Sequence, residues 1–521
     1  MKVSCIDFLE TGQFAPIFID FIQQKEHLKP FYHRPPTIAS FEGQIKDKSN
    51  SEIDRKSLVK VLKEQYKSID LVDELTHLQI ESLEKKNTFT LTTGHQLNIF
   101  TGPLYFHYKI ITVINACKKL KVIYPEYNFV PVYWMASEDH DLDEIKGIQM
   151  EGQKFKWATE QTGAVGRMHT DGLLELAKSI DSKGKIFQKA YGEAKNLADA
   201  TRSYVHQLYR KEGLVILDAD DAMLKANFKA VIKDDILNHT ANALVNEQSA
   251  KLDNLGYKSQ TYPREINFFY LTTGERNRIV VEDDHYAILD KDTKFTKMEI
   301  LQEIEAHPER FSPNVILRPL YQEQILPNLS YTGGPAEVAY WMQLKPVFDR
   351  YNTVFPILLP RNFGLVIPNI VQHKLKKLKM ADAEIFIETE NLKKNITKKI
   401  SGQKLNLNEE RQSLNQLLDE IKQYAGEIDY SLNEMAAAET QKVMNTLDKI
   451  EKKMIAAEKR KHANKMRQID EIKAYLYPSN GPQERKENFL PFIQADEKFI
   501  EKLIKALDPF NLQFHLMRWN G

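Results

Sequence analysis

The sequence is poor in cysteine, balanced in charge and free of long apolar runs. Its 521 residues include two cysteines, Cys5 and Cys117, which argues against a disulfide framework and favours a reducing compartment. Lysine plus arginine and aspartate plus glutamate each number 72, so bulk charge indicates neither nucleic acid nor an anionic membrane as a partner. No run approaches the roughly 18 apolar residues of a membrane span, and no signal-peptide core opens the chain. A cytoplasmic protein without a nucleic-acid or membrane partner is predicted.

Three familiar chemical signatures are also absent. The chain contains no GxGxxG dinucleotide fingerprint, no Walker A loop and no HExxH zinc motif. A chain of this length can hold two to four domains and a large core. Information about function must therefore come from polar residues that follow apolar segments.

The most informative stretch is Val130–Ser137 followed by Glu138, Asp139, His140 and Asp141. The apolar run is short and rich in β-branched and aromatic residues, so it predicts a buried strand. Ligands in open α/β sheets bind where the chain leaves the carboxyl ends of the strands, and three carboxylates with an imidazole there indicate a functional site. The alternative is a solvated helix start, because acidic residues also suit the first turn of a helix.

A second strand-to-helix turn has a similar character. The threonine-rich Phe89–Thr93 predicts a strand, and a helix that contains Lys109 follows, with Pro103 in its first turn and Thr101 as its cap. Backbone N–H groups after a glycine at a helix start are suited to bind a phosphate or carboxylate. The polar positions of this turn are Gly94, His95, Gln96, Asn98, Thr101 and Gly102. By itself, the histidine fits a structural role as well as a catalytic one.

A third cluster lies far downstream. Arg318 and Arg361 are placed at the ends of the strand-like runs Val315–Leu320 and Val354–Pro360, where an arginine can clamp a carboxylate or phosphate. Between the two arginines, a Gly-Gly-Pro turn opens another helix. The further candidates in this region are Tyr331, Gly333, Gly334, Glu337, Tyr340, Trp341 and Asn362. The alternative is that both arginines form ordinary, partly buried ion pairs.

Together the three turns predict an α/β fold: a Rossmann-like parallel-sheet core, an inserted α/β subdomain and a long antiparallel α-helical coiled-coil arm. Leu214–Leu217 predicts another buried strand, and Ile266–Leu271 predicts a hairpin with Arg278–Val281. The predicted boundaries are 1–151 and 314–370 for the core, 152–313 for the inserted connective subdomain, 371–478 for the arm, and 479–521 for a C-terminal segment that returns to the core.

The arm is predicted from heptad spacing. Apolar residues at 4-3 spacing run from Val371 to Ile396 and resume until Gly426, a predicted helix stop. Residues 430–475 contain neither proline nor glycine and predict one helix roughly 70 Å long, although the heptad register slips after Ala457. Heptads with charged flanks and intervening turns indicate an antiparallel, intrachain coiled coil, which is a candidate dimer arm.

The motifs, taken in order, resemble one known family. The matching strings are TTGHQLNIFTGPLYFHYK, PVYWMASEDHDLDEI, VILRPLYQEQILPNLSYTGGPAEVAYWMQL, PILLPRN and Gln483-Glu484-Arg485. They resemble the BshC family, the cysteine-adding enzymes of bacillithiol biosynthesis, over most of the chain. The segment Glu151–Asp253 carries no matching motif, and Pro482 stands where leucine is usual. The resemblance implies a homodimeric ligase that adds L-cysteine to the amine of glucosaminyl malate, forming an amide in the last step of the pathway.

An amide ligase needs an activated acyl group, an anion site and a base for the incoming amine. The candidate catalytic residues are His95, Glu138, Asp139, His140 and Asp141. The candidate substrate-binding residues are Gly94, Gln96, Asn98, Thr101, Gly102, Lys109, Trp134, Arg318, Tyr331, Gly333, Gly334, Glu337, Tyr340, Trp341, Arg361 and Asn362. One pocket is predicted to join His95 to the 138–141 cluster, with Arg361 or the Gly94 turn on the carboxylate of cysteine and Glu138 or Asp139 on its ammonium. No metal ligand is assigned.

The route of acyl activation stays open at this stage. The Gly94-His95 pair resembles a reduced HIGH motif of class I nucleotidyl transferases, but one of the two histidines and the KMSKS loop are missing. ATP with Mg²⁺ therefore has no supporting nucleotide motif, and the sequence does not show whether another protein supplies activated cysteine. Two other functions also fit the residues: a metal-dependent hydrolase or transferase that uses His95, His140 and carboxylates, and a non-catalytic coiled-coil adaptor.

Overall fold

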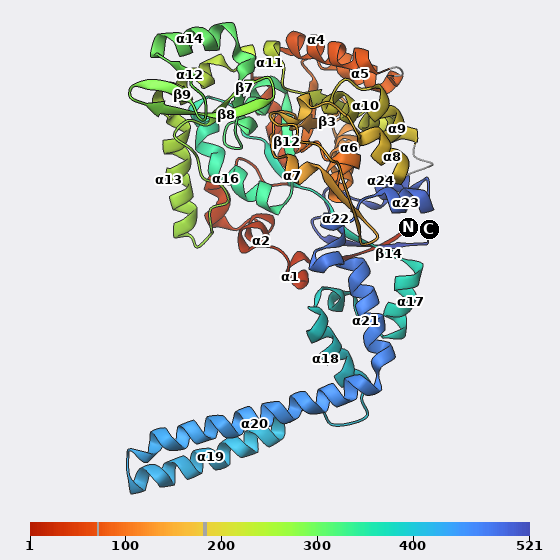
Figure 1. Ribbon diagram of the computed structural model, residues 1–521, viewed down its shortest axis with the longest axis vertical. Helices are drawn as coiled ribbons and strands as arrows, with labels where there is room; N and C mark the ends of the chain where they lie inside the picture. The colour runs from red at the N-terminus through yellow and green to blue at the C-terminus, as the bar shows by residue number, and fades with distance from the viewer. Residues whose placement is uncertain (70–71, 181–184, 521) are drawn as a thin grey trace. The chain divides into compact units, whose positions relative to one another are not determined.

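The computed structural model describes residues 1–69, 72–180 and 185–520, and the chain forms two compact units (Figure 1). The first unit comprises Met1–Val366 and Pro482–Met517, and the second comprises Ile367–Gly481 and Arg518–Asn520. In chain order, the second unit is therefore inserted between two parts of the first.

A five-stranded parallel sheet forms the centre of the first unit. Its strands, in spatial order, are β13 (Ile357–Pro360), β12 (Asn328–Gly333), β2 (Thr88–His95), β3 (Asn128–Met135) and β6 (Val215–Asp218). All neighbours pair in parallel, and Thr92 lies opposite both Val132 of β3 and Tyr331 of β12. The predicted Rossmann-like core is confirmed, and so is the strand predicted at Leu214–Leu217.

Helices cover this sheet and complete the first unit. They are α1 (Phe8–Thr11), α2 (Pro16–Ile22), α3 (Ser40–Ser49), α4 (Arg55–Gln65), α5 (Glu74–Ser82), α6 (Tyr105–Ile123), α7 (Leu142–Ile145), α8 (Leu173–Ile180), α9 (Lys185–Glu193), α10 (Leu197–Tyr209), α11 (Ala222–Ala226), α12 (Lys229–Asn238), α13 (Thr240–Asn254), α14 (Lys297–Ala306), α15 (Arg318–Ile325), α16 (Pro335–Arg350), α22 (Gln483–Lys486), α23 (Leu490–Ala495) and α24 (Phe499–Ala506). Within the described ranges of the whole chain, no helix is both long and apolar enough to cross a membrane.

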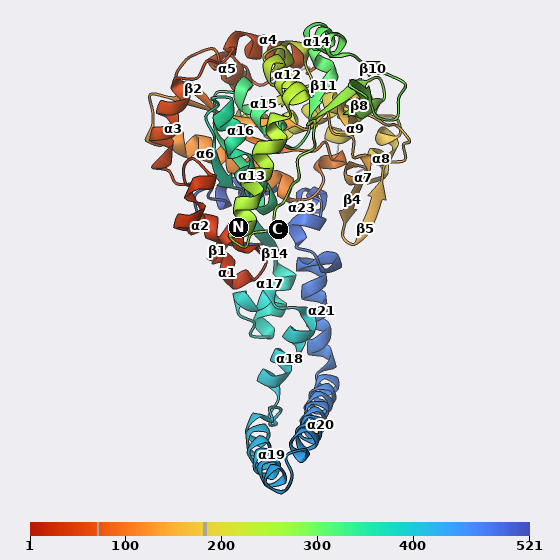
Figure 2. The ribbon, with the colours of Figure 1, turned by 90° about the vertical axis from the view of Figure 1, so that its left-hand side faces the viewer.

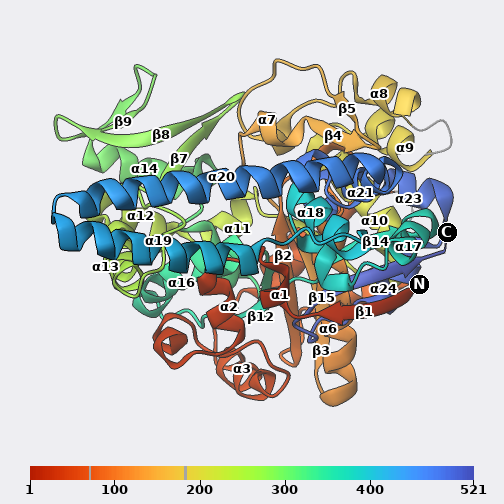
Figure 3. The same ribbon diagram turned by 90° about the horizontal axis from the view of Figure 1, so that it is seen from below.

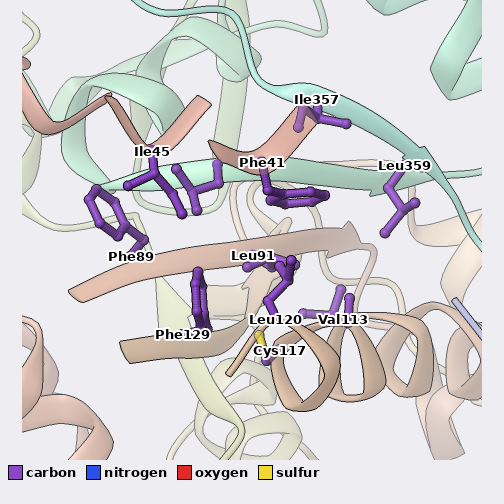
Figure 4. Packing of buried hydrophobic residues seen from close by; sticks show 12 residues of the cluster. Phe41, Ile45, Phe89, Leu91, Val113, Cys117, Leu120, Phe129, Ile357 and Leu359 are labelled. Atoms are coloured by element: carbon purple, nitrogen blue, oxygen red, sulfur yellow. The ribbon is translucent and has the colours of Figure 1, made fainter. Parts of the chain in front are cut away.

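The apolar core lies where α3 and α6 meet the central strands. All residues of β2 are buried, and Phe89 and Leu91, two positions apart, face the same side of the sheet. They pack with Phe41 of α3 and with Val113 and Cys117 of α6 (Figure 4). The threonines that alternate with them on β2 are buried as well, as expected for a strand covered on both faces.

The strand order reverses beside β2. From β2 the chain runs through α6 to β3 and later to β6 on one side, whereas β12 and β13 lie on the other side. Such a reversal opens a crevice at the carboxyl ends of the strands, where α/β sheets bind ligands. The parallel pairing brings His95, Met135 and Pro360, the last residues of β2, β3 and β13, to the same edge. The three polar turns predicted from the sequence therefore meet at one edge of one sheet.

A second sheet lies outside this core. It is antiparallel, with spatial order β10 (Lys294–Phe295), β9 (His285–Ile288), β8 (Glu275–Glu282), β7 (Phe268–Thr272) and β11 (Phe311–Pro313), and β4 (Gly147–Met150) pairs separately with β5 (Gln153–Lys156). The predicted hairpin is confirmed, with Phe269 opposite Arg278. Strand β6 falls within the predicted insertion 152–313 but belongs to the central sheet, because its apolar residues complete that sheet beside β3.

A third sheet contains the strands nearest the two ends of the chain. Its spatial order is β1 (Lys2–Ile6), β15 (Phe514–Trp519) and β14 (Phe363–Pro368). Strand β14 comes directly after β13 in the chain. Strand β15, close to the C-terminus, therefore pairs with the strand that follows the carboxyl end of β13.

The second unit is helical. Its helices are α17 (Asn369–Lys377), α18 (Thr389–Ile400), α19 (Asn408–Ile428), α20 (Leu432–Lys461) and α21 (Ala463–Leu476), with a short 3₁₀ helix at Asp382–Phe386. Helices α19 and α20 lie side by side as an antiparallel hairpin, and α18 lies beside α21 (Figures 2 and 3). The predicted intrachain antiparallel coiled coil is confirmed.

Two helices of the arm are shorter than predicted. The apolar spacing after Val371 does not form one helix, because Lys379 between α17 and α18 adopts a φ of 51°. The helix predicted over 430–475 is interrupted at His462, whose ψ of 28° ends α20. This break lies close to the position where the heptad register slips, so the slip marked a real interruption.

Gly426 does not end its helix, contrary to the prediction. Helix α19 continues to Ile428, and a Cβ on the glycine would lie 2.5 Å from Asn433 Oδ1 in α20. The missing side chain therefore permits the two helices of the hairpin to approach closely near their turn.

Leu91→Ala should destabilise the first unit by about 2–5 kcal/mol, because it removes a fully buried side chain from the centre of the sheet. Leu78→Ala is the matched control, since Leu78 is 55% exposed on α5. Calorimetric melting should show a lowered midpoint for the first variant only. Equal midpoints for the two variants would contradict the placement of the core.

Candidate active site at the carboxyl edge of the parallel sheet

A buried ion pair lies where the strand order reverses. Lys109 of α6 donates from Nζ to the Gly94 carbonyl oxygen at 2.8 Å and to Glu337 Oε1 at 2.9 Å. The lysine side chain is 4% exposed. The pair therefore joins the end of β2 to the first turn of α16, on the two sides of the crevice.

Glu337 is fixed by two further donors. Its Oε2 accepts from the Gly334 N–H at 2.8 Å, which caps α16, and its Oε1 accepts from the Tyr331 hydroxyl at 2.6 Å. Burial opposes ionisation, but the Lys109 ammonium and these donors outweigh it and lower the pKa of Glu337. Burial also lowers the pKa of Lys109, and the facing carboxylate opposes that shift. The predicted Gly-Gly-Pro helix start is confirmed, and its carboxylate is a partly buried anion, 24% exposed.

Arg318 is a partly buried cation of this site that lacks a carboxylate partner among the described residues. Its guanidinium lies 5.9 Å from the ring centre of Trp134 and 5.7 Å from that of Tyr331. Nη1 donates to Gln322 Oε1 at 3.0 Å, and a further hydrogen bond joins the guanidinium to Tyr340. Throughout the described ranges, no carboxylate forms an ion pair with it. These neutral partners leave its positive charge available to an anion.

Gly94 leaves room for this guanidinium. A Cβ at the glycine would lie 3.8 Å from Arg318 Nη1 and 3.4 Å from the Tyr331 hydroxyl. Arg318 begins α15 and does not end a strand, contrary to the prediction for Val315–Leu320. Pro319 suits the first helical turn, which explains why the segment is helical.

Arg361 follows β13, as predicted, but its charge is already matched. Nη2 donates to Glu484 Oε1 at 2.6 Å, and both side chains are 4% exposed. The second oxygen of Glu484 accepts from the Gly364 N–H at 3.0 Å. The neighbouring Asn362 donates to the Asp508 carbonyl oxygen at 2.7 Å, which links β13 to the C-terminal segment.

His95 ends β2 and is buried. Its ring centre lies 5.2 Å from that of Tyr105 and 5.3 Å from that of Phe106, and its Nε2 has no hydrogen-bond partner among the described residues. Burial, together with the cations Lys109 and Arg361, holds the pKa of His95 well below its usual range. The imidazole is therefore neutral at pH 7 and can accept a proton or a hydrogen bond from a ligand.

Gln96 links this region to the acidic cluster after β3. Its Nε2 donates to Asp139 Oδ2 at 2.8 Å and to Glu144 Oε2 at 2.7 Å. Asn98 donates to the Glu144 carbonyl oxygen at 3.0 Å. The structure thus brings Asp139 next to the residue that follows His95, as the prediction of one site required.

The turn between β2 and α6 differs from the prediction. Helix α6 has Leu104 at its N-cap, so Thr101 is not the cap. Thr101 Oγ1 hydrogen-bonds to His107 Nε2 at 3.0 Å, and Gly102 packs against Asn98, where a Cβ would lie 2.7 Å from the asparagine Cβ. Because the strand continues through the residue after Gly94, the anion-binding helix start predicted there does not form.

Glu138 belongs to a separate charged group beside β6. It forms a short ion pair with Lys225, which also lies 3.6 Å from Asp220 Oδ1. Burial raises the pKa of Glu138, although the lysine opposes the shift. Burial and the neighbouring Asp220 likewise raise the pKa of Asp218, which accepts a short hydrogen bond from Ser137. The charge of Glu138 is therefore directed toward β6 and not toward His95.

His140 and Asp141 lie at the outer side of the cluster. His140 Nδ1 lies 2.8 Å from Arg276 Nη1, and burial with this cation lowers the pKa of the histidine. Asp141 is exposed and its Oδ1 accepts from the Glu144 N–H at 3.2 Å as the cap of α7. The solvated helix start considered for this stretch is therefore realised at Asp141.

Two other candidates have mainly packing contacts. The Trp341 ring stacks on Tyr331 at 4.3 Å and lies 5.8 Å from Phe348. A Cβ at Gly333 would lie 2.9 Å from the Glu337 Cβ, so the glycine permits the tight start of α16. Within the described part of the chain, no three His, Cys, Asp or Glu side chains are grouped as a metal site.

Comparison with known proteins places this geometry in a family. Residues 1–362 match the bacillithiol biosynthesis BshC N-terminal Rossmann-like domain, and residues 364–519 match the BshC C-terminal coiled-coil domain. The chain belongs to the BshC family. The two matched domains correspond to the parallel-sheet core and the helical arm.

Full-length relatives agree with the BshC assignment. A protein of Flavobacterium psychrophilum named "Putative cysteine ligase BshC" is 41% identical, covering 99% of this chain and 100% of its own. A BshC protein of Christiangramia forsetii with the same name is also 41% identical, covering 99% of both chains. A third, from Chlorobaculum tepidum, is 30% identical over 89% of this chain and 88% of its own.

The sequence did not single out four residues that the structure places beside the BshC candidates. They are Tyr105, Lys225, Arg276 and Glu484. Glu484 was noticed only as part of a shared Gln-Glu-Arg string. A charged residue between glutamine and arginine on a short helix gives no local sign of its distant partner.

Acid should destabilise the protein through His107. Its ring hydrogen-bonds to Tyr209 at 2.7 Å, and burial lowers the pKa of His107 to about 3. The unfolded histidine takes up a proton near pH 6.5 whereas the folded one does not. The stability that the neutral ring contributes is therefore complete above roughly pH 6.5 and is lost as the pH falls toward 3, with about 2 kcal/mol lost by pH 5.

His107→Gln should reduce the fall of the thermal midpoint between pH 7.5 and pH 5, because glutamine does not titrate. His285→Gln, at an exposed histidine, should keep the wild-type fall. Differential scanning calorimetry at both pH values makes the comparison. The same pH dependence in all three proteins would show that His107 is not the neutral buried group described here.

Proposed function

We propose that the protein is a ligase that joins L-cysteine to the amine of glucosaminyl malate, forming an amide in the last step of bacillithiol synthesis. Membership of the BshC family and the printed names of the relatives support this proposal. The observation that carries it at the site is Arg318, a partly buried cation with no carboxylate partner among the described residues. Family membership favours this reaction over the metal-dependent hydrolase and the adaptor.

Arg318 is the proposed anchor for the cysteine carboxyl group. A partly buried guanidinium that is hydrogen-bonded only to neutral groups gains from an anionic ligand, because the lowered local dielectric strengthens the attraction. Arg361 was the sequence-based choice, but its pairing with Glu484 removes most of that gain. Lys109 is likewise matched by Glu337. The comparison of these three cations therefore favours Arg318 as the anchor of the carboxyl group.

His95 is the proposed base for the incoming amine. An amine attacks a carbonyl carbon only after it has lost its extra proton, and His95 Nε2 is an acceptor without a hydrogen-bond partner among the described residues. Asp139, held by Gln96, is the proposed partner of a substrate ammonium. Glu138, His140 and Asp141 are proposed to support this edge of the site through their neighbours.

The reaction also needs a leaving group. The new bond joins the cysteine carboxyl carbon to the amine nitrogen, and an oxygen leaves that carbon on the group that activates it. A nucleoside triphosphate is the class of co-reactant that can take this oxygen. ATP with Mg²⁺ is therefore proposed for the assay, although the chain has no nucleotide motif.

Arg318→Gln and His95→Gln should each lower cellular bacillithiol at least tenfold in a strain lacking its own enzyme. The first variant removes the anion anchor and the second removes the proton acceptor. Mass spectrometry of the thiol and of accumulated glucosaminyl malate provides the measurement. Thermal midpoints should change by only a few degrees in both variants.

Two control variants accompany this test. Arg278→Gln alters an exposed arginine and should leave thiol content at the wild-type level. Asp141→Asn distinguishes a direct catalytic carboxylate from a helix cap, because asparagine also caps helices well. If the wild-type gene fails to restore the thiol, the proposed function is wrong; if Arg318→Gln restores it fully, only the anchor assignment is wrong.

We also propose that the α19–α20 hairpin pairs with a second copy of the chain in the cytoplasm. A two-helix hairpin leaves part of its apolar surface exposed, and here Leu417, Ile421 and Tyr424 are 53%, 49% and 61% exposed. These residues recur at the 4-3 spacing of a coiled-coil seam. Covering such a stripe with the same stripe of a partner gives a closed, symmetric dimer.

Ile421→Glu combined with Tyr424→Glu should convert the dimer into a monomer, because each change places a charge in the apolar interface. Gln423→Glu, at an exposed position of the same helix, should leave the dimer intact. Light scattering coupled to size exclusion measures the mass. A dimer that persists after replacement of residues 408–461 by a short flexible linker would remove the dimer proposal and leave the helical hairpin itself unaffected.

A further inference from the structure

Two buried side chains of the return segment, Pro482–Asn488, reach the edges of the candidate site. Here the chain re-enters the first unit after the helical arm. Glu484 holds Arg361 by the ion pair described above and accepts from the Gly364 N–H with its other oxygen. Both carboxylate oxygens of Glu484 therefore accept hydrogen bonds, and one of these bonds comes from the Arg361 guanidinium.

Asn488 holds the turn that follows His95. Its Nδ2 donates to the Phe100 carbonyl oxygen at 2.8 Å and to the Gly102 carbonyl oxygen at 2.6 Å. Its Oδ1 accepts from the Leu490 N–H at 2.9 Å. Both hydrogen bonds donated by the Asn488 side chain thus go to backbone carbonyl oxygens of the same short turn.

This turn has an unfavourable backbone. Phe100, Thr101 and Gly102 adopt φ values of 50°, 68° and 65° in succession. For the two non-glycine residues, such a conformation costs on the order of 1–3 kcal/mol each and persists only where the surroundings fix it. Asn488 donates two of the hydrogen bonds that fix the turn. The Tyr191 hydroxyl accepts a third from the Phe100 N–H at 2.9 Å.

The turn and the ion pair converge on one ring. The strained turn leads into Tyr105, whose ring centre lies 5.2 Å from that of His95 and 5.2 Å from the guanidinium carbon of Arg361. The Leu104 N–H also donates to the Glu487 carbonyl oxygen at 2.8 Å, which ties the start of α6 to the return segment. Movement of the return segment would therefore displace the Tyr105 ring, which lies against His95, and the Arg361 guanidinium.

We propose that Glu484 and Asn488 are positioning residues of the ligase site: Glu484 orients Arg361, and Asn488 fixes the Phe100–Gly102 turn that places Tyr105 against His95. The catalytic part of this inference rests on the proposed function. Its structural part, the hold on the turn and on the arginine, stands on the contacts alone. Neither residue touches the reacting atoms.

The test uses Asn488→Ala and Glu484→Gln in the full chain, with Lys486→Ala as the matched control at an exposed position of the same segment. Glutamine keeps the size of Glu484 and an acceptor for the Gly364 N–H but loses the charge that holds Arg361. Hydrogen exchange followed by mass spectrometry reports on residues 99–104. Calorimetry of L-cysteine binding and thiol content in the complemented strain report on the site.

In Asn488→Ala, exchange at residues 99–104 should rise at least tenfold while the peptide of β3 keeps its protection. In Glu484→Gln, thiol content in the complemented strain should fall at least tenfold, while the dissociation constant for L-cysteine, which Arg318 anchors, stays near wild type and the thermal midpoint moves by less than about 3 °C. A role in folding alone would lower the midpoint in step with any loss of thiol. Lys486→Ala should match wild type in every measurement.

A double variant checks that the effect of Glu484 passes through Arg361. Arg361→Gln combined with Glu484→Gln should keep thiol content within threefold of the weaker single variant, because residues that act as one unit are not additive. Multiplied losses, or wild-type thiol content in Glu484→Gln, would overturn the role of Glu484. Unchanged exchange at 99–104 in Asn488→Ala would overturn that of Asn488.

The outcomes also separate this inference from the proposed function. If the wild-type protein neither binds L-cysteine nor restores the thiol, the proposed ligase activity fails. The exchange measurement on Asn488→Ala is independent of any substrate, so it still decides whether the return segment holds the turn.

Discussion

The buried ion pair between Lys109 and Glu337 is the interaction on which the arrangement of the site depends. Taking two charges out of water is expensive, so such a pair adds little to stability. Removing one partner is costly, because it leaves an uncompensated buried charge. Here the lysine also binds the Gly94 carbonyl oxygen and the glutamate caps α16, so the pair fixes the end of β2 relative to the next strand's helix.

The distribution of charge around this pair has a clear consequence. Three cations, Lys109, Arg318 and Arg361, lie near the crevice, but two of them have their own buried carboxylates. Burial, together with the positive ends of the matched pairs, keeps His95 neutral, while the pairs contribute little net attraction to a ligand. A single unmatched guanidinium then determines where an anionic group is bound most strongly. Specificity at this edge follows from which cation lacks a partner and not from the number of cations.

Local features of the sequence were sufficient for the architecture. The strands ending at His95 and Met135 are short apolar runs followed directly by polar residues, and parallel pairing brings their carboxyl ends together. Heptad spacing similarly predicted the helical hairpin, including the irregularity at His462. Where the prediction was wrong, as for the helix at Arg318, a short apolar run fitted a strand and a helix equally well.

The fine structure of the site depended on partners that no local pattern identifies. Glu138 is bound by Lys225, 87 positions away, and Arg361 by Glu484, 123 positions away. A run of acidic residues looks the same whether its carboxylates face a ligand or a buried lysine. Their direction was fixed only by the tertiary fold, so the predicted single cluster after β3 became one residue linked to His95 through Gln96 and others that are paired elsewhere.

The position of the return segment in the chain imposes an order on synthesis. At a translation rate of 5–20 residues per second, the interval between the emergence of Arg361 and that of Glu484 is on the order of ten seconds. The parallel strands and α16 are already complete at that time, and the hairpin of the arm, whose contacts are local, can form next. The turn after His95 and the guanidinium of Arg361 must wait for their partners. The edge of the candidate site is therefore among the last parts of the chain to reach its final conformation on the ribosome, and a chain released early would contain a folded core without a finished site.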